Sequence, residues 1–348
     1  MKWKNHINSR RPHLLPARIM TRIFTFPLSL IMVAGLVMAC GSGNAGAQTD
    51  STLVEDAPPA SASTTFNADS AYNYVARQVE FGPRVPNTEA HRRAGDWLIS
   101  ELRRHGAHEV IEQPLSLRAF DGTMLKARNI MARFNPEAQE RILLLAHWDC
   151  RPWADEDPDP AKHTQPVDGA NDGASGVGVL LELARQLGKE TPRKGVDILL
   201  VDAEDWGTDG DEDSWALGAQ AFAENPPVKG YSAKEAILLD MVGGENAIFR
   251  REYFSEKAAS NLNAALWDTA ARLGYSANFD NRPGGAITDD HIRLIEAGIP
   301  TVDIIEYNPV GGGFNPRWHT STDNMDGISA TTLGAVGNVV LTYIRNNY

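Results

Sequence analysis

The sequence contains little cysteine and little positive charge. Only Cys40 and Cys150 occur among 348 residues, so a framework of disulfides is excluded and a hydrophobic core has to provide the stability. Lys and Arg number 33 against 45 Asp and Glu. Nucleic-acid-binding and polybasic membrane-binding surfaces need clusters of positive charge, so we expect neither. The acidic loops 155–159 and 209–213 lack the EF-hand spacing, and we expect them to be solvated rather than calcium-binding.

Long apolar runs are also missing. The run over residues 23–39 is shorter than the roughly 20 residues of a membrane helix. Arg18 and Arg22 precede it, and small residues and Cys40 end it, which predicts a signal peptide over residues 1–39. The ending is similar to that of bacterial lipoprotein signals, although plain secretion and an uncleaved anchor are alternatives. The resemblance implies a lipid anchor at Cys40 as the only membrane attachment, and Ser42 implies the periplasmic face of the outer membrane.

The rest of the chain divides into a tether and a folded domain. Cleavage after residue 39 removes six basic residues and no acidic ones, leaving 27 basic against 45 acidic side chains. Residues 40–66 are rich in Gly, Ala, Ser and Pro, and we expect a lipidated N-terminus followed by a flexible tether. Residues 67–348 form one domain, because a hydrophobic content of 42% is ample for a single large core.

Strand-like and helix-like patterns alternate along this domain. We expect helices at 69–80, 88–105, 174–188, 214–224, 256–273 and 331–346, and strands at 108–113, 125–134, 141–146, 195–201, 235–239 and 300–305. We expect the first strands to pair in antiparallel orientation. The later alternation of strands and helices is typical of parallel strands joined by helices. The sequence therefore predicts a single-domain α/β fold with a mixed, mostly parallel central sheet and helices on both faces.

Polar residues follow several of the predicted strands. His147 and Asp149 follow the strand at 141–146, the acids of Asp202-Ala-Glu-Asp205 follow the strand at 195–201, and Asp240 follows the strand at 235–239. Buried polar groups are costly unless they coordinate, pair or hydrogen-bond, and ligands collect at the carboxyl ends of parallel strands. The sequence therefore predicts a site at this edge of the sheet.

Asp172, Asp205 and His319 are the residues that we assign to a zinc ion. Zinc takes carboxylate oxygen and imidazole nitrogen, and a catalytic zinc keeps one position open. Asp172 stands in the glycine-flanked segment 169–176, and His319 in a Trp-His-Thr loop. Taken singly, Asp172 could be a helix N-cap, Asp205 a turn residue and His319 a surface residue. Jointly, the three favour a metal site.

Other side chains near these ligands are candidates for catalysis and substrate binding. Glu204 adjoins Asp205, and a carboxylate beside a metal-bound reactant is a natural general base and acid. Asp240 and Asp289 are further acids of the same layer, and crowded carboxylates share protons. Trp215 and Trp318 are candidates for apolar pocket walls, with Trp206 as an alternate; core packing is the other explanation for each.

Short motifs along the domain occur in the order of the zinc aminopeptidase-like superfamily. They are HWD at 147–149, GANDGASG at 169–176, DAEDWG at 202–207, LLDMVGGEN at 238–246, TDDH at 288–291, GIPTVDII at 298–305 and RWHT at 317–320. Within that superfamily the phrases RPWADEDPD, DAEDWGT and WALGAQ resemble glutaminyl-peptide cyclotransferases, in the bacterial form that is similar to the animal enzymes.

This resemblance implies an enzyme that cyclises the N-terminal Gln of peptides to pyroglutamate and releases ammonia. It implies one zinc per chain on Asp172, Asp205 and His319, Glu204 as a proton shuttle, and Asp240 and Asp289 as its hydrogen-bonded partners.

Two other functions remain open for this sequence. Peptidase relatives bind a second metal at the positions of His147 and Asp240, and both residues are present, so a two-metal aminopeptidase is an alternative. Asp205, where peptidases usually carry Glu, and Asp289, where they commonly carry Ser, favour the cyclase. A non-catalytic binding ectodomain is a second alternative. Such a protein would be expected to have lost some of the metal-ligand residues, and all of them are present here.

Overall fold

The computed structural model describes residues 65–348. The predicted signal peptide, residues 1–39, and most of the predicted tether, residues 40–66, lie outside the described residues. At the start of the described part, Phe66 is buried and contacts Gly337 of the last helix. Among the helices of residues 65–348, none combines the length and the apolar character needed to cross a membrane.

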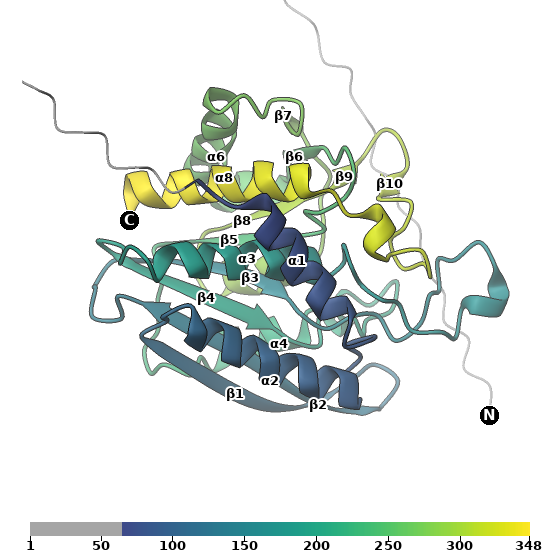
Figure 1. Cartoon of the computed structure of the whole chain (residues 1–348). Coiled ribbons are helices and arrows are strands. Elements are labelled where there is room, and N and C mark those ends of the chain that lie inside the picture. Colours follow the sequence, from purple (N-terminus) through teal and green to yellow (C-terminus); the bar gives the residue numbers. More distant parts are fainter. Residues whose placement is uncertain (1–64) are drawn as a thin grey trace, which may run out of the picture. The chain divides into compact units, whose positions relative to one another are not determined.

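The domain is built from helices that alternate with the strands of one main sheet (Figure 1). The helices are α1 (Ala68–Val79), α2 (Glu89–Arg104), α3 (Ala174–Leu187), α4 (Leu217–Glu224), α5 (Tyr253–Ala258), α6 (Ser260–Arg272), α7 (Asp290–Glu296) and α8 (Ala330–Asn347). The main strands are β1 (Glu109–Arg118), β2 (Met124–Phe134), β3 (Arg141–His147), β4 (Gly195–Val201), β5 (Glu235–Asp240) and β8 (Thr301–Ile305). Small sheets pair β6 (Phe249–Arg251) with β7 (Phe279–Pro283) and β9 (Tyr307–Asn308) with β10 (Gly313–Phe314). Short 3-10 helices are η1 (Pro160–Lys162), η2 (Glu212–Ser214) and η3 (Met325–Gly327).

The main sheet has the strand order β1-β2-β4-β3-β5-β8. β2 is antiparallel to both of its neighbours, whereas β4, β3, β5 and β8 are parallel. The predicted mixed, mostly parallel sheet is therefore confirmed.

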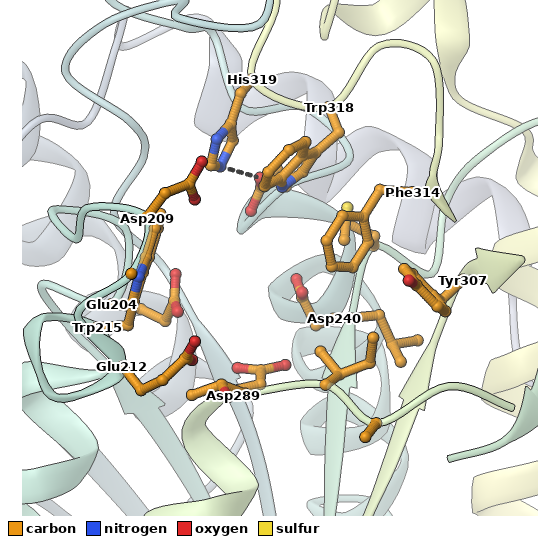
Figure 2. Close-up of a pocket in the computed structure, with 17 residues that line it drawn as sticks. Glu204, Asp209, Glu212, Trp215, Asp240, Asp289, Tyr307, Phe314, Trp318 and His319 are labelled. Atoms are coloured by element: carbon orange, nitrogen blue, oxygen red, sulfur yellow. Dashed lines mark ion pairs between the residues drawn. The ribbon is translucent and has the colours of Figure 1, made fainter. Parts of the chain in front are cut away.

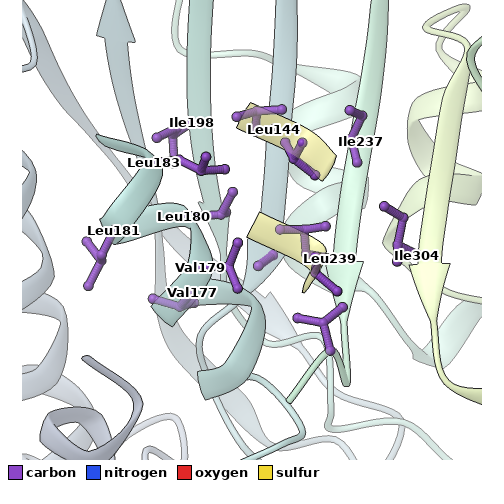
Figure 3. Packing of buried hydrophobic residues seen from close by; sticks show 14 of the residues in the cluster. Leu144, Val177, Val179, Leu180, Leu181, Leu183, Ile198, Ile237, Leu239 and Ile304 are labelled. Carbon is purple, nitrogen blue, oxygen red and sulfur yellow. The ribbon is translucent and has the colours of Figure 1, made fainter. Parts of the chain in front are cut away.

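Helices cover both faces of the sheet, as the alternation of residues in β3 shows. Ile142 and Leu144 pack in the larger core, which includes side chains of α1, α2, α3 and α8. Leu143 and Leu145 point to the other face and pack with side chains of α4 and α7. Figure 3 shows side chains of α3 beside Leu144 and its neighbours on the adjacent strands. Because both faces are covered, β3 is buried throughout its length.

The carboxyl ends of β4, β3 and β5 border one crevice. β4 and β5 lie on opposite sides of β3, which is the arrangement that places ligands between strand ends in open α/β sheets. α3 approaches β5 closely here, because a Cβ on Gly176 would lie 2.1 Å from the carbonyl oxygen of Leu239. The helix that follows Asp172 is therefore fixed against the strand that ends in Asp240.

The predicted helix 256–273 is divided in the structure. The backbone of Ala259 is not helical, with φ of −140° and ψ of 41°, so it separates α5 from α6. α5 also begins earlier than predicted, because the Glu252 carboxylate accepts hydrogen bonds from the backbone N–H groups of Phe254 and Ser255.

The predicted helix 214–224 begins only at Leu217. Trp215 is extended and Ala216 is left-handed, with φ of 58°, so neither can continue a helix. α7 and the four short strands were not predicted, because segments of two to seven residues are too short to show a periodic pattern.

Candidate active site

The three predicted metal ligands come from separate segments and meet at the carboxyl edge of the sheet. Asp172 lies just before α3, Asp205 lies in the loop after β4, and His319 lies in the loop before η3. One ligand atom from each residue lies within 4.8 Å of the other two, and all three residues are buried. The structure thus brings together the whole predicted ligand set.

The distances and the unpaired atoms of this group suit a tetrahedral cation. His319 Nε2 lies 3.0 Å from Asp205 Oδ1 and 3.5 Å from Asp172 Oδ2. Ligands bound about 2.0–2.1 Å from a tetrahedral ion are about 3.3 Å apart, so these separations fit. Neither carboxylate oxygen of Asp205 has a hydrogen-bond partner, although both are buried. Such a carboxylate is costly, and a cation bound here would remove that cost.

Two other carboxylates hold the loops that carry these ligands. Asp323 accepts hydrogen bonds from the backbone N–H groups of Asn171 and Asp172, at 2.8 and 3.1 Å. Asp149 does the same for Glu204 and Asp205, at 3.2 and 3.3 Å. Because each clamp fixes two successive N–H groups, the ligand side chains are oriented before any ion binds.

His147 forms a second group of potential ligands with Asp172 and Asp240. Its Nε2 lies 2.9 Å from Asp172 Oδ1 and 3.2 Å from Asp240 Oδ1, and the latter contact is a hydrogen bond. Burial disfavours the charged imidazole, but hydrogen bonds to these acids and to Asp149 outweigh burial and hold the pKa of His147 well above its ordinary value. These contacts hold the three side chains of this group together at the edge of the sheet.

Glu204, Asp240 and Asp289 face one shared cavity (Figure 2). Burial, together with the charges of Asp205 and Asp289, raises the pKa of Glu204 well above its ordinary value. Burial also raises the pKa of Asp240, and burial with the charge of Asp240 raises that of Asp289 strongly. Crowded acids of this kind retain shared protons near neutral pH, so the cluster can both accept and donate a proton.

A third group of potential ligands, Asp289, His291 and Asp303, lies behind the cavity. His291 Nε2 is 3.3 Å from Glu252 Oε2, and its Nδ1 is 3.6 Å from Asp303 Oδ2. The imidazole is held between two carboxylates, and it fixes the start of α7, which Asp289 caps. Sequence analysis assigned no role to these three supporting residues, although His291 lies in the TDDH motif and Asp303 in GIPTVDII; Glu252 lies in none of the motifs.

The two predicted aromatic wall residues lie beside the ligand His319. Both Trp215 and Trp318 line the cavity, and their rings stack on that of His319 with centroids 6.0 and 3.7 Å away. Trp206 is not among the lining residues; it packs against the cluster that contains Ala119, Leu125 and Ala203. The alternate assignment of Trp206 to the pocket is therefore wrong.

The cavity has a volume of about 260 Å³, and several of its lining residues were not predicted. These are Asp209, Gly210, Glu212, Met241, Ala286, Ile287, Thr288, Ile305, Tyr307 and Phe314. Tyr307 and Phe314 lie in the two strands of a small hairpin, and the ring of Phe314 packs on Trp318 with centroids 4.7 Å apart. Thr288 could have been identified from its place in the TDDH motif, whereas the hairpin had no such signal.

The acidic loop 155–159 is not simply solvated, as had been predicted. Asp157 is buried and accepts hydrogen bonds from the backbone N–H and the hydroxyl of Ser321. Asp155 lies 3.7 Å from His319 Nδ1 and is paired with Arg151. The loop therefore supports the segment that carries His319, although Glu156 and Asp159 are exposed. The side chains at 209–213 all match the solvated prediction.

The fold, the ligand set and the enclosed acid cluster together define an α/β metalloenzyme. Residues 129–344 match the profile of peptidase family M28, so the chain belongs to that family.

Solved structures and a curated protein support this assignment. The crystal structure of Bacteroides thetaiotaomicron glutaminyl cyclase bound to N-acetylhistamine is 50% identical, with a TM-score of 0.80 over 82% of this chain and 99% of that chain. A Zn-dependent exopeptidase from Parabacteroides distasonis is 54% identical, with a TM-score of 0.80 over 81% of this chain and 99% of that chain. Glutaminyl-peptide cyclotransferase of Bos taurus is 23% identical over 293 residues, 75% of this chain and 77% of the bovine protein.

Proposed function

We propose that this protein is a glutaminyl cyclase, which converts the N-terminal glutamine of peptides and proteins to pyroglutamate and releases ammonia. The observation that carries the proposal is that Glu204 lines the same cavity as two of the ligands, Asp172 and His319. The third ligand, Asp205, lies within 4.8 Å of both, and its buried carboxylate oxygens have no hydrogen-bond partner. The similarity to the Bacteroides cyclase over 99% of its chain supports the same conclusion.

Zinc is the cation that these ligands favour, and we assign one ion per chain. Asp172, Asp205 and His319 offer the oxygen and nitrogen donors of a catalytic zinc site, and the similar exopeptidase is described as Zn-dependent. Among the acids of the two groups of potential ligands, the carboxylate oxygens without a hydrogen-bond partner are those of Asp205. In the second group, His147 and Asp240 hydrogen-bond to one another. When bound, zinc supplies a Lewis acid that polarises the side-chain amide of the substrate.

The residues of this chain have defined tasks in the reaction. The α-amine nitrogen of the substrate attacks its own side-chain amide carbon, a five-membered lactam closes, and the amide nitrogen leaves as ammonia. Glu204 accepts a proton from the attacking amine and delivers it to the leaving nitrogen. The charge of Asp289 helps to raise the pKa of Glu204, so the proton is retained until it is needed.

The cavity walls act by shaping the substrate. Because the reaction is intramolecular, its rate depends on folding the glutamine side chain back toward the α-amine. Trp215 and Trp318 provide flat apolar walls on either side of His319, and the acids of the cavity attract the cationic N-terminus.

A two-metal aminopeptidase is the second candidate. The specific observation that favours it is the group His147, Asp172 and Asp240, whose potential ligand atoms all lie within 4.8 Å of one another. The similarity to a structure described as a Zn-dependent exopeptidase, at 54% identity, supports the same candidate.

Ammonia release separates the two functions. On Gln-initiated peptides we expect ammonia to be released in proportion to the pyroglutamate formed, and Glu204→Gln to lower kcat by about 100-fold or more while the protein still binds zinc. The matched control is Glu137→Gln, which changes an exposed acid that does not line the cavity and should have a much smaller effect on kcat. Release of free amino acids from Leu-initiated peptides, without cyclisation of Gln peptides, would identify an aminopeptidase instead.

We further propose that the protein is a lipoprotein of the cell envelope, anchored through Cys40 to the periplasmic face of the outer membrane. The support is the order of basic, apolar and small residues before Cys40. In a Cys40→Ser variant the protein should leave the membrane fraction, and retention there would contradict the lipid anchor.

A further inference from the structure

We propose that the peptide chain following the substrate glutamine lies in a groove between α5 and α7, and that the enzyme prefers substrates with an apolar side chain at position three. The inference rests on the proposed function, since it concerns the part of a Gln-initiated peptide that is not cyclised. We name this surface the α5–α7 groove. Its lining residues are Glu212, Asp213, Phe254, Lys257, Ala258, Thr288, Ile292, Arg293, Ile295 and Glu296.

The groove presents an apolar floor to solvent. Phe254 and Ala258 lie four residues apart on α5, and Ile292 and Ile295 lie three apart on α7, so each pair shares one helix face. Phe254 is 36% exposed, and the groove has a volume of about 590 Å³. A floor of this kind is suited to one or two apolar side chains of an extended peptide.

The groove is continuous with the active-site cavity. Glu212 and Thr288 line both, and Thr288 immediately precedes Asp289, one of the cavity acids. Cyclisation consumes only the first residue of the substrate. The rest of the chain must therefore leave the cavity at its rim, and an open groove that begins at that rim is the surface on which it would lie.

The opposite rim of the cavity is closed by aromatic rings. A second hollow of about 340 Å³ also shares Tyr307 and Phe314 with the cavity. These two rings pack edge to face with centroids 4.9 Å apart, and Phe314 packs in turn on Trp318. The packed rings form a wall, and Figure 2 shows Tyr307 and Phe314 across the cavity from Glu212. The exit for the substrate chain is therefore on the Glu212 side.

The two cations at the groove already have partners within the chain. Arg293 donates a hydrogen bond of 2.8 Å to the backbone carbonyl of Glu212 and lies 3.2 Å from Asp213 Oδ1 and 3.4 Å from Glu296 Oε2. Lys257 lies 5.5 Å from the centroid of the Tyr253 ring. Because these cations have partners, apolar contact with Phe254 and the two isoleucines is the main interaction left for a substrate.

The test compares kcat/KM for three amidated tetrapeptides, Gln-Ala-Phe-Ala, Gln-Ala-Ser-Ala and Gln-Ala-Lys-Ala. For the wild-type protein we expect the Phe peptide to exceed the Ser peptide by about tenfold, as an apolar pocket discriminates at this level. In Phe254→Asp this ratio should fall toward one, and the Lys peptide should become the better substrate. That gain in the use of the Lys peptide would not result from a loss of folding.

A matched control is Ile248→Asp, which places the same charge at an apolar residue that is 43% exposed and lines the second hollow. This variant should keep the wild-type ratio. If the wild-type enzyme cyclises the Phe and Ser peptides with equal kcat/KM, the inference about the groove is overturned but the proposed function is not. No cyclisation of any peptide would overturn the proposed function as well. Conversion of a wild-type dimer to a monomer by Phe254→Asp would identify the groove as a contact between copies, and would also overturn the inference.

Discussion

Chemically similar carboxylates of this site differ in role because they differ in their partners. Asp202 accepts hydrogen bonds from His91 and from the backbone of Arg128, so it has a structural role away from the cavity. Asp205, three residues later, has no hydrogen-bond partner and is available to a cation. Glu204, which adjoins Asp205, lines the cavity, where burial and neighbouring charges raise its pKa. A run of acids in the sequence thus separates into three functions through contacts with distant residues.

The number of zinc ions bound per chain tests the roles of Asp205 and His147. We expect Asp205→Asn to weaken zinc binding by about 100-fold or more, since even residues that only support a ligand contribute about 10- to 100-fold. We expect His147→Gln to retain one zinc per chain, because His147 is held by hydrogen bonds to acids. Elemental analysis of the purified proteins provides the measurement. Two zinc ions in the wild-type protein and one in His147→Gln would contradict the assignment.

At the scale of the elements, close packing of α3 on β5 positions the site. α3 begins directly after the segment that holds Asp172, and β5 ends in Asp240. A movement of the helix away from the strand would separate these two acids. Gly176 permits the close approach, because any side chain there would contact the carbonyl oxygen of Leu239.

Gly176→Ala should therefore destabilise the protein. We expect a decrease of about 2–3 kcal/mol in the free energy of unfolding, since the added Cβ would meet backbone at 2.1 Å. Gly334→Ala in α8 is a matched control, because its Cβ would meet only the Cβ of Ala68 at 3.0 Å, and we expect a change within about 1 kcal/mol. Urea unfolding measures both. Equal effects of the two substitutions would show that the α3–β5 contact is not the cause.

For the molecule as a whole, buried ionisable groups make stability depend on pH. His105 follows α2 and accepts or donates a hydrogen bond of 2.8 Å with the Tyr74 hydroxyl of α1. Burial, and then the charge of Arg104, lowers the pKa of His105 to about 4. An unfolded chain protonates His near pH 6.5. Between these values the unfolded state binds more protons, so stability decreases as the pH falls.

Replacement of this histidine should reduce that dependence. Between about pH 7 and pH 4, we expect the free energy of unfolding to decrease by about 2 kcal/mol more in the wild-type protein than in His105→Gln. This figure is smaller than the full pKa shift would give, because solvent screens the charge of the exposed Arg104. Urea unfolding of both proteins at several pH values gives the difference. A difference that stays constant with pH would exclude His105 as the source.

Much of the architecture could be predicted from the chain, and the exceptions have physical causes. The buried strands and long amphipathic helices follow local periodicity, so the mixed sheet and its covering helices were predicted correctly. The early start of α5 was not, because Glu252, which caps this helix, also contacts His291 of α7, a contact between segments far apart in the sequence. α7 itself has only seven residues, too few for a helical pattern to be recognised.

The sequence by itself determined the fold class, the family and the set of candidate ligands, because each depends on residue type at strand ends and within short motifs. Only the tertiary structure decided which acids pair, which remain without partners, and how the cavity is enclosed. Tyr307 and Phe314 close one rim, Asp155 supports His319, and Glu212 joins the cavity to the α5–α7 groove. These roles depend on contacts between loops distant in the chain, whose meeting is set by packing rather than by any local pattern.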